Sequence, residues 1–263
     1  PLTCVALRHS GICPLPPSRK DGGRRWPFGQ IFDRGEEISK GYLLDKGIDI
    51  SLIIRYSLHM KAVAIIPARY ASTRLPGKPL LVIKGKPLIQ YVYERVKSSS
   101  VQQVIVATDD ERIAAAVKAF GGEAVLTSPR HRSGTERVAE VAAGIDADII
   151  VNCQGDEPLI KPEAIDEAVM PFAKDPAIMV TTLITSLQDV TDLGNPHVVK
   201  VVVDHDGYAL YFSRAVIPYP TNLLEKRGDE AHTGNEVIER SDNYGLTGYW
   251  QHIGLYAFRR EFL

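Results

Sequence analysis

The chain has 263 residues, enough for one large domain or two small ones, and its 44% hydrophobic and 24% charged composition excludes a disordered or fibrous protein. The net charge of −1 argues against bulk nucleic-acid binding, which needs a basic excess. No apolar run approaches the roughly 20 residues that span a bilayer, so we expect no membrane partner. The three cysteines, Cys4, Cys13 and Cys153, are odd in number and lack metal-ligand spacing, which indicates a reducing compartment such as the cytoplasm.

Residues 1–59 differ from the rest of the chain. They are rich in glycine and proline, show no sustained helical or alternating pattern before Ile48–Ile54, and precede the first methionine, Met60. We expect them to be poorly ordered or loosely docked. A targeting peptide is one interpretation, but acidic residues such as Glu36 and Glu37 are unusual in transit peptides. We favour a non-native N-terminal extension, with the functional domain at 60–263.

From Met60 onward, strand and helix patterns alternate. In chain order they predict the strand Ala62–Pro67, the helix Leu88–Val96, the strand Val104–Thr108, the helix Glu111–Phe120, the strand Ala124–Leu126, the helix Thr135–Ala143, the strand Asp148–Cys153, the helix Pro162–Ala173 and the strands Met179–Ile184, Val198–Val203, Tyr208–Ser213 and Tyr249–Phe258. Gly121 suits a helix end, and Pro162 suits a first helical turn. Asp206–Gly207 predicts a β-hairpin turn.

Such alternation predicts an α/β fold with a mostly parallel sheet and one β-hairpin excursion. In these folds ligands bind beyond the carboxyl ends of the strands. Four loops follow predicted strands and should converge there: Ala68–Lys78, Thr108–Asp110, Ser128–Glu136 and Gln154–Pro158.

The first of these loops is basic. Arg69, Arg74 and Lys78 are interspersed with small residues, so the loop can offer fixed cations and backbone N–H groups to a polyphosphate. It is not a Walker A loop, because Ser72 stands where the first glycine belongs and Pro79 where Ser or Thr would bind magnesium. No dinucleotide fingerprint follows the strand either. The charge pattern alone does not distinguish a phosphate-binding loop from a basic loop that is simply solvated.

The loop after Asp148–Cys153 is acidic. Asp156 and Glu157 follow a buried strand, where carboxylates add little stability but can ligate a hard cation such as Mg²⁺. Asp156 is the better ligand candidate, since it could link a metal to nucleotide phosphates. Alternatively, both carboxylates are turn and helix-end charges before Pro162.

A third loop, Ser133–Arg137, opens a helix. Ser133 or Thr135 as N-cap, with Glu136 in the first turn, explains most of it. The functional alternative is that this small-residue turn recognises a nucleotide base through backbone groups.

Six segments form one collinear pattern from Met60 to the chain end: IIPARYASTRLPGKPL (Ile65–Leu80), VATDD (Val106–Asp110), SGTER (Ser133–Arg137), VNCQGDEP (Val151–Pro158), KVVVDHDGYALYFSRAVIP (Lys200–Pro218) and HIGLYAF (His252–Phe258). Together they resemble the 3-deoxy-manno-octulosonate cytidylyltransferases, also called CMP-KDO synthetases. The first segment distinguishes them from sialic-acid cytidylyltransferases. The resemblance implies a three-layer, Rossmann-like α/β/α nucleotidyltransferase fold that transfers CMP from CTP to 3-deoxy-manno-octulosonate (KDO) for lipopolysaccharide synthesis, as a homodimer in the complete protein.

The resemblance also implies site roles. Arg69 and Lys78, assisted by Arg74, hold the CTP phosphates, and Asp156 binds Mg²⁺. The residues near cytosine and ribose are Ser133, Gly134, Thr135 and Arg137. The residues facing the sugar acid are Gln154, Arg214, His252 and Tyr256. An arginine suits the sugar carboxylate, because its planar fork pairs bidentately.

The pattern departs from the family at the carboxyl end. The family's second magnesium-binding aspartate, in a G-x-D-T-P-E-D-like motif, and a Glu-Gln pair that contacts the sugar do not occur in the sequence. We therefore expect the chain as written to be inactive or strongly impaired, since lost charge neutralisation has large effects. The alternatives are transfer to another sugar acid, such as 8-amino-KDO or a sialic acid, and a nucleotide-binding module without turnover.

Overall fold

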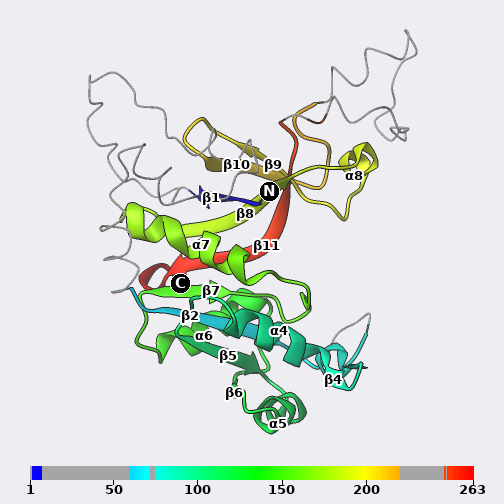
Figure 1. The fold of residues 1–263 in the computed structure, drawn as a ribbon, viewed down its shortest axis with the longest axis vertical. Helices are drawn as coiled ribbons and strands as arrows, with labels where there is room; N and C mark the ends of the chain where they lie inside the picture. Colours follow the sequence, from blue (N-terminus) through cyan, green and yellow to red (C-terminus); the bar gives the residue numbers. More distant parts are fainter. Residues whose placement is uncertain (1, 8–59, 72–74, 220–245, 247) are drawn as a thin grey trace. The chain divides into compact units, whose positions relative to one another are not determined.

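A computed structural model describes residues 2–7, 60–71, 75–219, 246 and 248–263 (Figure 1). The chain divides into two compact units. The smaller unit comprises Pro1–Ile38 and Leu183–Ile253, and the larger comprises Ser39–Thr182 and Gly254–Leu263. Each unit is described separately.

The larger unit is built on a mostly parallel sheet. Its strand order is β6 (Glu123–Leu126), β5 (Gln103–Thr108), β2 (Ala62–Ala68), β7 (Ile149–Asn152) and the second half of β11 (Trp250–Arg259). The first four strands run parallel, and β11 runs antiparallel to β7. The register pairs Ala68 with Thr108, so β2 and β5 end at the same edge. All these strands were predicted, with no bound shifted by more than one residue.

Four helices cover this sheet: α4 (Leu88–Lys97), α5 (Glu111–Ala119), α6 (Gly134–Ala143) and α7 (Pro162–Lys174). Their predicted end signals are confirmed, because Gly121 has a φ of 82° and Pro162 lies in the first turn of α7. The sequence missed three short elements after the basic loop: the 3₁₀ helix η1 (Lys78–Leu80) and the strands β3 (Val82–Ile83) and β4 (Lys86–Pro87). A further 3₁₀ helix, η3 (Arg260–Phe262), follows β11.

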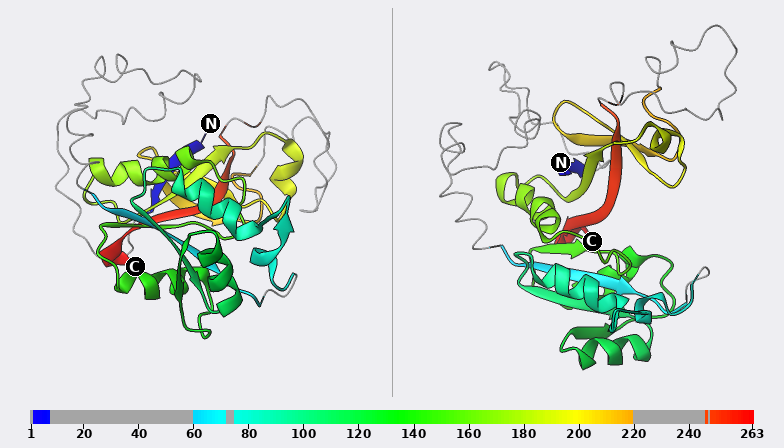
Figure 2. Two further views of the ribbon diagram at one scale, coloured as in Figure 1. Left: turned by 60° about the horizontal axis from the view of Figure 1, so that its bottom comes forward. Right: turned by 45° about the vertical axis from the view of Figure 1, so that its right-hand side comes forward.

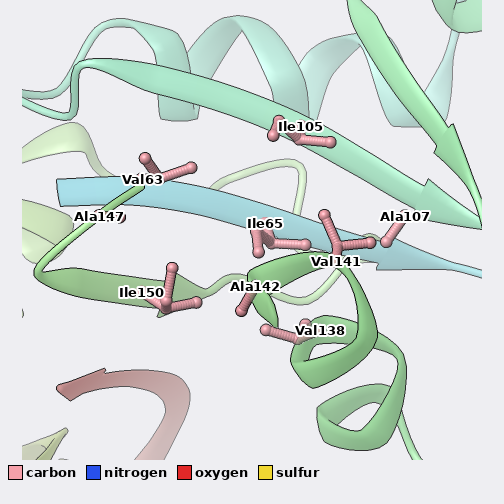
Figure 3. Packing of buried hydrophobic residues seen from close by; sticks show 9 residues of the cluster. All are labelled: Val63, Ile65, Ile105, Ala107, Val138, Val141, Ala142, Ala147 and Ile150. Atoms are coloured by element: carbon pink, nitrogen blue, oxygen red, sulfur yellow. The ribbon is translucent and has the colours of Figure 1, made fainter. Parts of the chain in front are cut away.

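The helices lie on both faces of the sheet, which gives three layers. Side chains from β2, β5 and β7 pack against Val138, Val141 and Ala142 of α6 (Figure 3). Alternation along β2 places Ile65 on this face and Ile66 on the other. Helix α4 contacts β2, β5 and α7 and lies across β2 in Figure 1 and in the right-hand view of Figure 2. The predicted α/β/α architecture is therefore confirmed.

The smaller unit contains the predicted hairpin. Strands β9 (Lys200–Val203) and β10 (Tyr208–Ser213) pair antiparallel around the turn at Asp206–Gly207, and Gly207 has a φ of 81°. Part of β8 (Val180–Ser186) and of β11 belongs to this unit, where β11 pairs with β9. A short helix, α8 (Val190–Gly194), was not predicted.

The N-terminal segment contains a strand that the sequence did not predict. β1 (Leu2–Leu7) pairs parallel with β10, and its Val5, 2% exposed, packs with Ile184 and Val201. The sequence analysis expected residues 1–59 to be poorly ordered or loosely docked and did not identify this strand, because six residues are too few to show a pattern within a glycine- and proline-rich segment. The remainder of 1–59, apart from these residues, lies outside the described part of the chain.

No helix among the described residues has the length and apolar character to cross a membrane.

We predict that Ile65→Ala destabilises the larger unit. Ile65 is fully buried against α6, so the truncation leaves a cavity and should cost about 3 kcal/mol of unfolding free energy in urea. Val82→Ala is the matched control, because Val82 is 70% exposed in the same unit. Equal effects of the two substitutions would contradict the assigned core.

Candidate active site

The basic loop leaves the carboxyl end of β2 and closes on itself. Arg69 is exposed at the end of the strand, and the Gly77 N–H donates to the Tyr70 carbonyl at 2.8 Å. Gly77 has a φ of 70°, and a Cβ there would lie 3.0 Å from the Tyr70 ring, so glycine is required by both backbone and space. The loop then enters η1 at Lys78. Arg74 lies outside the described residues.

The basic loop and the acidic loop meet. Lys78 Nζ lies 2.7 Å from Asp156 Oδ2, and the two side chains are 38% and 54% exposed. An exposed pair of this kind stabilises a fold by no more than about 1 kcal/mol. Its significance is therefore positional: it shows that the cation and the carboxylate share one place at the sheet edge, as the sequence predicted.

Close backbone packing holds three of the predicted loops together. A Cβ on Gly155 would lie 2.8 Å from the Pro67 carbonyl oxygen, and a Cβ on Gly134 would lie 3.2 Å from the Pro67 ring. Gly134 also approaches the Gln154 side chain, whose Oε1 would be 3.9 Å from that Cβ. The end of β2, the start of α6 and the acidic loop are therefore in direct contact.

The start of α6 is capped as the sequence predicted. Ser133 is the N-cap, and its hydroxyl accepts from the Glu136 N–H at 3.1 Å. The Thr135 hydroxyl accepts from Asn152 Nδ2 at 3.3 Å, and Thr135 as a whole is exposed to solvent. A capped helix N-terminus next to Gly134 favours a nearby anion or an electronegative ligand edge.

Arg137 is buried rather than open to solvent. Its side chain is 4% exposed, and its guanidinium donates to Asp109 Oδ2 at 2.8 Å and to the Thr127 hydroxyl. Asp109 follows β5, so this pair joins α6 to the predicted loop Thr108–Asp110. The sequence did not single out Asp109 or Thr127; the signal available was the Asp109–Asp110 pair after the strand.

A second unpredicted residue is Asn152, the last residue of β7. It is fully buried, it donates to Thr135, and its Oδ1 lies 3.5 Å from Gln154 Nε2. The register places it opposite Tyr256 of β11. Burial raises the pKa of Tyr256, whose ring stacks on Phe258 with centroids 6.0 Å apart.

The acidic loop can hold a divalent cation. Partial burial and the charge of Asp156 raise the pKa of the Glu157 carboxyl, and Lys78 opposes that effect. Asp156 already attracts the Lys78 ammonium, and its oxygens are the donors that Mg²⁺ prefers. No cluster of three or more His, Cys, Asp or Glu that could hold a metal occurs within the described ranges. Asp156 nonetheless fits Mg²⁺, which commonly takes one or two carboxylates and completes its shell with substrate phosphates and water.

The other two predicted residues belong to the smaller unit. The Arg214 side chain donates to the Pro196 carbonyl at 2.6 Å. His252 lies edge-on to Phe212, with ring centroids 5.1 Å apart, and burial lowers its pKa to about 4. The imidazole is therefore neutral at pH 7 and can both donate and accept a hydrogen bond.

Comparison with known proteins identifies the family to which the chain belongs. The cytidylyltransferase family profile matches residues 63–263, which defines the class. A 3-deoxy-manno-octulosonate cytidylyltransferase of Geotalea daltonii is 54% identical over 205 residues, covering 78% of this chain and 77% of the relative. The chain thus belongs to the 3-deoxy-manno-octulosonate cytidylyltransferase family.

Two further matches agree. The Aliivibrio fischeri protein of that name is 48% identical over 207 residues, covering 78% of this chain and 77% of the relative. A solved CMP:2-keto-3-deoxy-manno-octonic acid synthetase complexed with CTP is 46% identical, with a TM-score of 0.66 over 77% of this chain and 75% of that chain.

We predict that Gly155→Ala disrupts the contact between the acidic loop and β2. The new methyl group would clash with the Pro67 carbonyl at 2.8 Å, so the loop must move, at a cost of about 1–3 kcal/mol in urea unfolding. Gly254→Ala is the control, since nothing lies within 4 Å of its Cβ position. An unchanged stability of Gly155→Ala would contradict the packing of the two loops.

His252 should make stability fall with acid. Its folded pKa of about 4 lies below the ordinary 6.5, so the unfolded chain binds more protons between these values and stability declines as pH falls from 6.5 to 4. His252→Gln should reduce the loss of unfolding free energy between pH 7 and pH 4.5 by roughly 2 kcal/mol. His205→Gln, on the exposed hairpin turn, should leave the loss unchanged. The same pH profile for both variants would contradict a buried neutral His252.

Proposed function

We propose that this protein transfers CMP from CTP to KDO, giving CMP-KDO and pyrophosphate and so activating KDO for lipopolysaccharide synthesis. The observation that carries the proposal is the 2.7 Å contact between Lys78 and Asp156, where the basic and acidic loops meet. Support for the substrates comes from relatives named 3-deoxy-manno-octulosonate cytidylyltransferase and from the similarity to a synthetase solved with CTP.

The basic loop is the proposed triphosphate site. Arg69 and Lys78, assisted by Arg74, would neutralise the phosphate charges and keep the chain of phosphates in line. Arg69 is exposed and Lys78 is half-exposed, so both can reach a bound nucleotide. Their task is alignment and charge neutralisation, the main contributions a protein makes to phosphoryl transfer.

The start of α6 is the proposed nucleoside site. Ser133, Gly134 and Thr135 would lie near cytosine and ribose, where backbone groups of a capped helix start are in place. Arg137 shares this role by fixing Asp109 and Thr127 at the adjacent loop, since its own guanidinium is buried between them. A buried, paired arginine makes this part of the site rigid.

Four residues are proposed for the sugar acid: Gln154, Arg214, His252 and Tyr256. Arg214 would pair with the KDO carboxylate. Both Gln154 and Tyr256 lie near Asn152. Gln154 is two residues after it in the sequence, and Tyr256 pairs with it across the sheet. The neutral His252 would donate to or accept from a sugar hydroxyl.

The reaction is an in-line displacement at the α-phosphorus. The anomeric hydroxyl oxygen of KDO forms the new P–O bond, the bond to the β-phosphate oxygen breaks, and the hydroxyl proton passes to solvent. Mg²⁺, held by Asp156, would polarise the α-phosphate and favour ionisation of the hydroxyl. Arg69 and Lys78 neutralise the pyrophosphate as it leaves.

The proposal extends to the setting of the enzyme. Cys153 is a buried free thiol, which supports a reducing compartment and hence the cytoplasm. The family resemblance supports a homodimer in the complete protein.

Substitutions at the two meeting loops test the site by CTP binding. Lys78→Met should weaken CTP binding about tenfold or more in calorimetry with Mg²⁺, because a charge-assisted contact to phosphate is lost. Asp156→Asn should instead abolish the dependence of CTP affinity on Mg²⁺. Lys86→Met is the control: Lys86 forms a similar exposed ion pair, with Glu94 at 2.8 Å, away from the loop.

Acceptor choice is tested with the same chain loaded with Mg²⁺ and a CTP analogue whose α,β-phosphate bridge cannot be cleaved. KDO should bind, and 8-amino-KDO and sialic acid should bind more weakly. Stronger binding of sialic acid would contradict KDO as the acceptor.

In the CTP-binding test of the two loops, equal CTP affinity of Lys78→Met and Lys86→Met would contradict the triphosphate site.

A further inference from the structure

The smaller unit contains a buried cation that the proposed reaction does not use. Lys200, the first residue of β9, is 0% exposed, and within the described part of the chain its ammonium is bonded to backbone carbonyls and forms no ion pair with a carboxylate. Its three hydrogen bonds reach the carbonyls of Asn195 at 2.9 Å, Val198 at 2.7 Å and Arg214 at 2.8 Å. All three N–H donors of the ammonium are thus used.

A cation in this position is costly to bury. Removing an ammonium from water is unfavourable unless hydrogen bonds replace the lost hydration, and an apolar side chain of similar length would avoid the cost. Burial and the nearby Arg214 guanidinium lower the pKa of Lys200, whereas Asp192 raises it. The ammonium therefore needs an explanation beyond packing.

The three carbonyls belong to two segments at the open end of the β9–β10 hairpin. Asn195 and Val198 lie in the turn before β9, and Arg214 follows the end of β10. The Arg214 side chain closes the arrangement, because its Nη1 donates to the Pro196 carbonyl at 2.6 Å, in that same turn. Lys200 thus fixes the backbone of Arg214 and also the turn on which the Arg214 guanidinium rests.

Within the described part of the chain, the Arg214 guanidinium is anchored by a backbone carbonyl and not by a carboxylate. A backbone carbonyl accepts a hydrogen bond but does not neutralise the cation, and among the residues described no carboxylate forms an ion pair with Arg214. A guanidinium with a fixed backbone and one anchored nitrogen is preorganised for bidentate pairing with a carboxylate.

We propose that Lys200 is a positioning residue for acceptor recognition: its ammonium holds Arg214 in the orientation that pairs with the carboxylate of the sugar acid. The inference rests on the proposed function, in which Arg214 binds that carboxylate. A merely structural lysine would stabilise the unit without distinguishing the acceptor from the nucleotide.

Lys200→Met, which keeps the side-chain length and removes the donors, tests this by calorimetry on the full chain. KDO binding in the presence of Mg²⁺ and a CTP analogue whose α,β-phosphate bridge cannot be cleaved should weaken about tenfold, while CTP binding stays within about twofold, since only the Arg214 contact is disturbed. Combining Lys200→Met with Arg214→Ala should weaken KDO binding no more than Arg214→Ala alone, because residues that act through one contact are not additive.

Ile184→Ala is the control for general destabilisation. Ile184 is 1% exposed in the same unit and packs with Val5 and Val201, so its truncation lowers stability without removing a hydrogen bond to Arg214. It should leave KDO affinity unchanged. Equal losses of KDO and CTP affinity in Lys200→Met, or additive losses in the double variant, would overturn the positioning role.

Hydrogen exchange of the unmodified chain tests the same arrangement without a variant. The amides of residues 195, 197–200 and 213–216 should exchange slowly before KDO is added and should change little afterwards. Fast exchange that slows only with KDO would show that the ligand, and not Lys200, orders Arg214. Failure of the unmodified chain to bind KDO would instead contradict the proposed function, and this inference with it.

Discussion

The pairing of one cation with one carboxylate at the carboxyl edge of the larger unit's sheet is the contact on which the functional account depends. Lys78 and Asp156 are 78 residues apart, and they meet because β2 and β7 are neighbouring parallel strands. The loop after each strand must emerge at the same edge. An exposed pair adds little to stability, so its importance lies in putting phosphate-binding charge beside a metal ligand.

Small residues make this meeting possible. Gly155 lies against the Pro67 carbonyl and Gly134 against the Pro67 ring, so a side chain at either position would push the loops apart. Around them, buried polar groups connect the ends of neighbouring elements. Arg137 forms an ion pair with Asp109, and Asn152 donates a hydrogen bond to Thr135. The loops that form the site are thus held together by close contacts at Gly155 and Gly134 and by the hydrogen bonds of Arg137 and Asn152.

Local signals in the sequence were sufficient for most of the fold. Apolar runs predicted the parallel strands, and Gly121 and Pro162 marked helix ends, because these features act within a few residues. Ser133 was one of two N-cap candidates, and the structure selects it over Thr135. The site followed from loop chemistry combined with the rule that ligands bind at strand ends. The family resemblance added roles that charge and spacing alone left open.

The residues that sequence reasoning missed depend on contacts between distant segments. Lys200 reads as an ordinary strand lysine until the structure shows its ammonium among three carbonyls. Arg137 was predicted as a site residue, but its partners Asp109 and Thr127 were not. β1 becomes visible only through its pairing with β10. None of these partners can be inferred from periodicity, because the information lies in which elements become neighbours.

The most direct test is a crystal structure of this chain with CTP and Mn²⁺, read through the anomalous signal of manganese. The account predicts one metal peak at the Asp156 carboxylate, with the triphosphate on Arg69 and with Lys78 moved from Asp156 to a phosphate oxygen. A metal peak remote from Asp156, or a triphosphate bound elsewhere while Lys78 stays on Asp156, would contradict it.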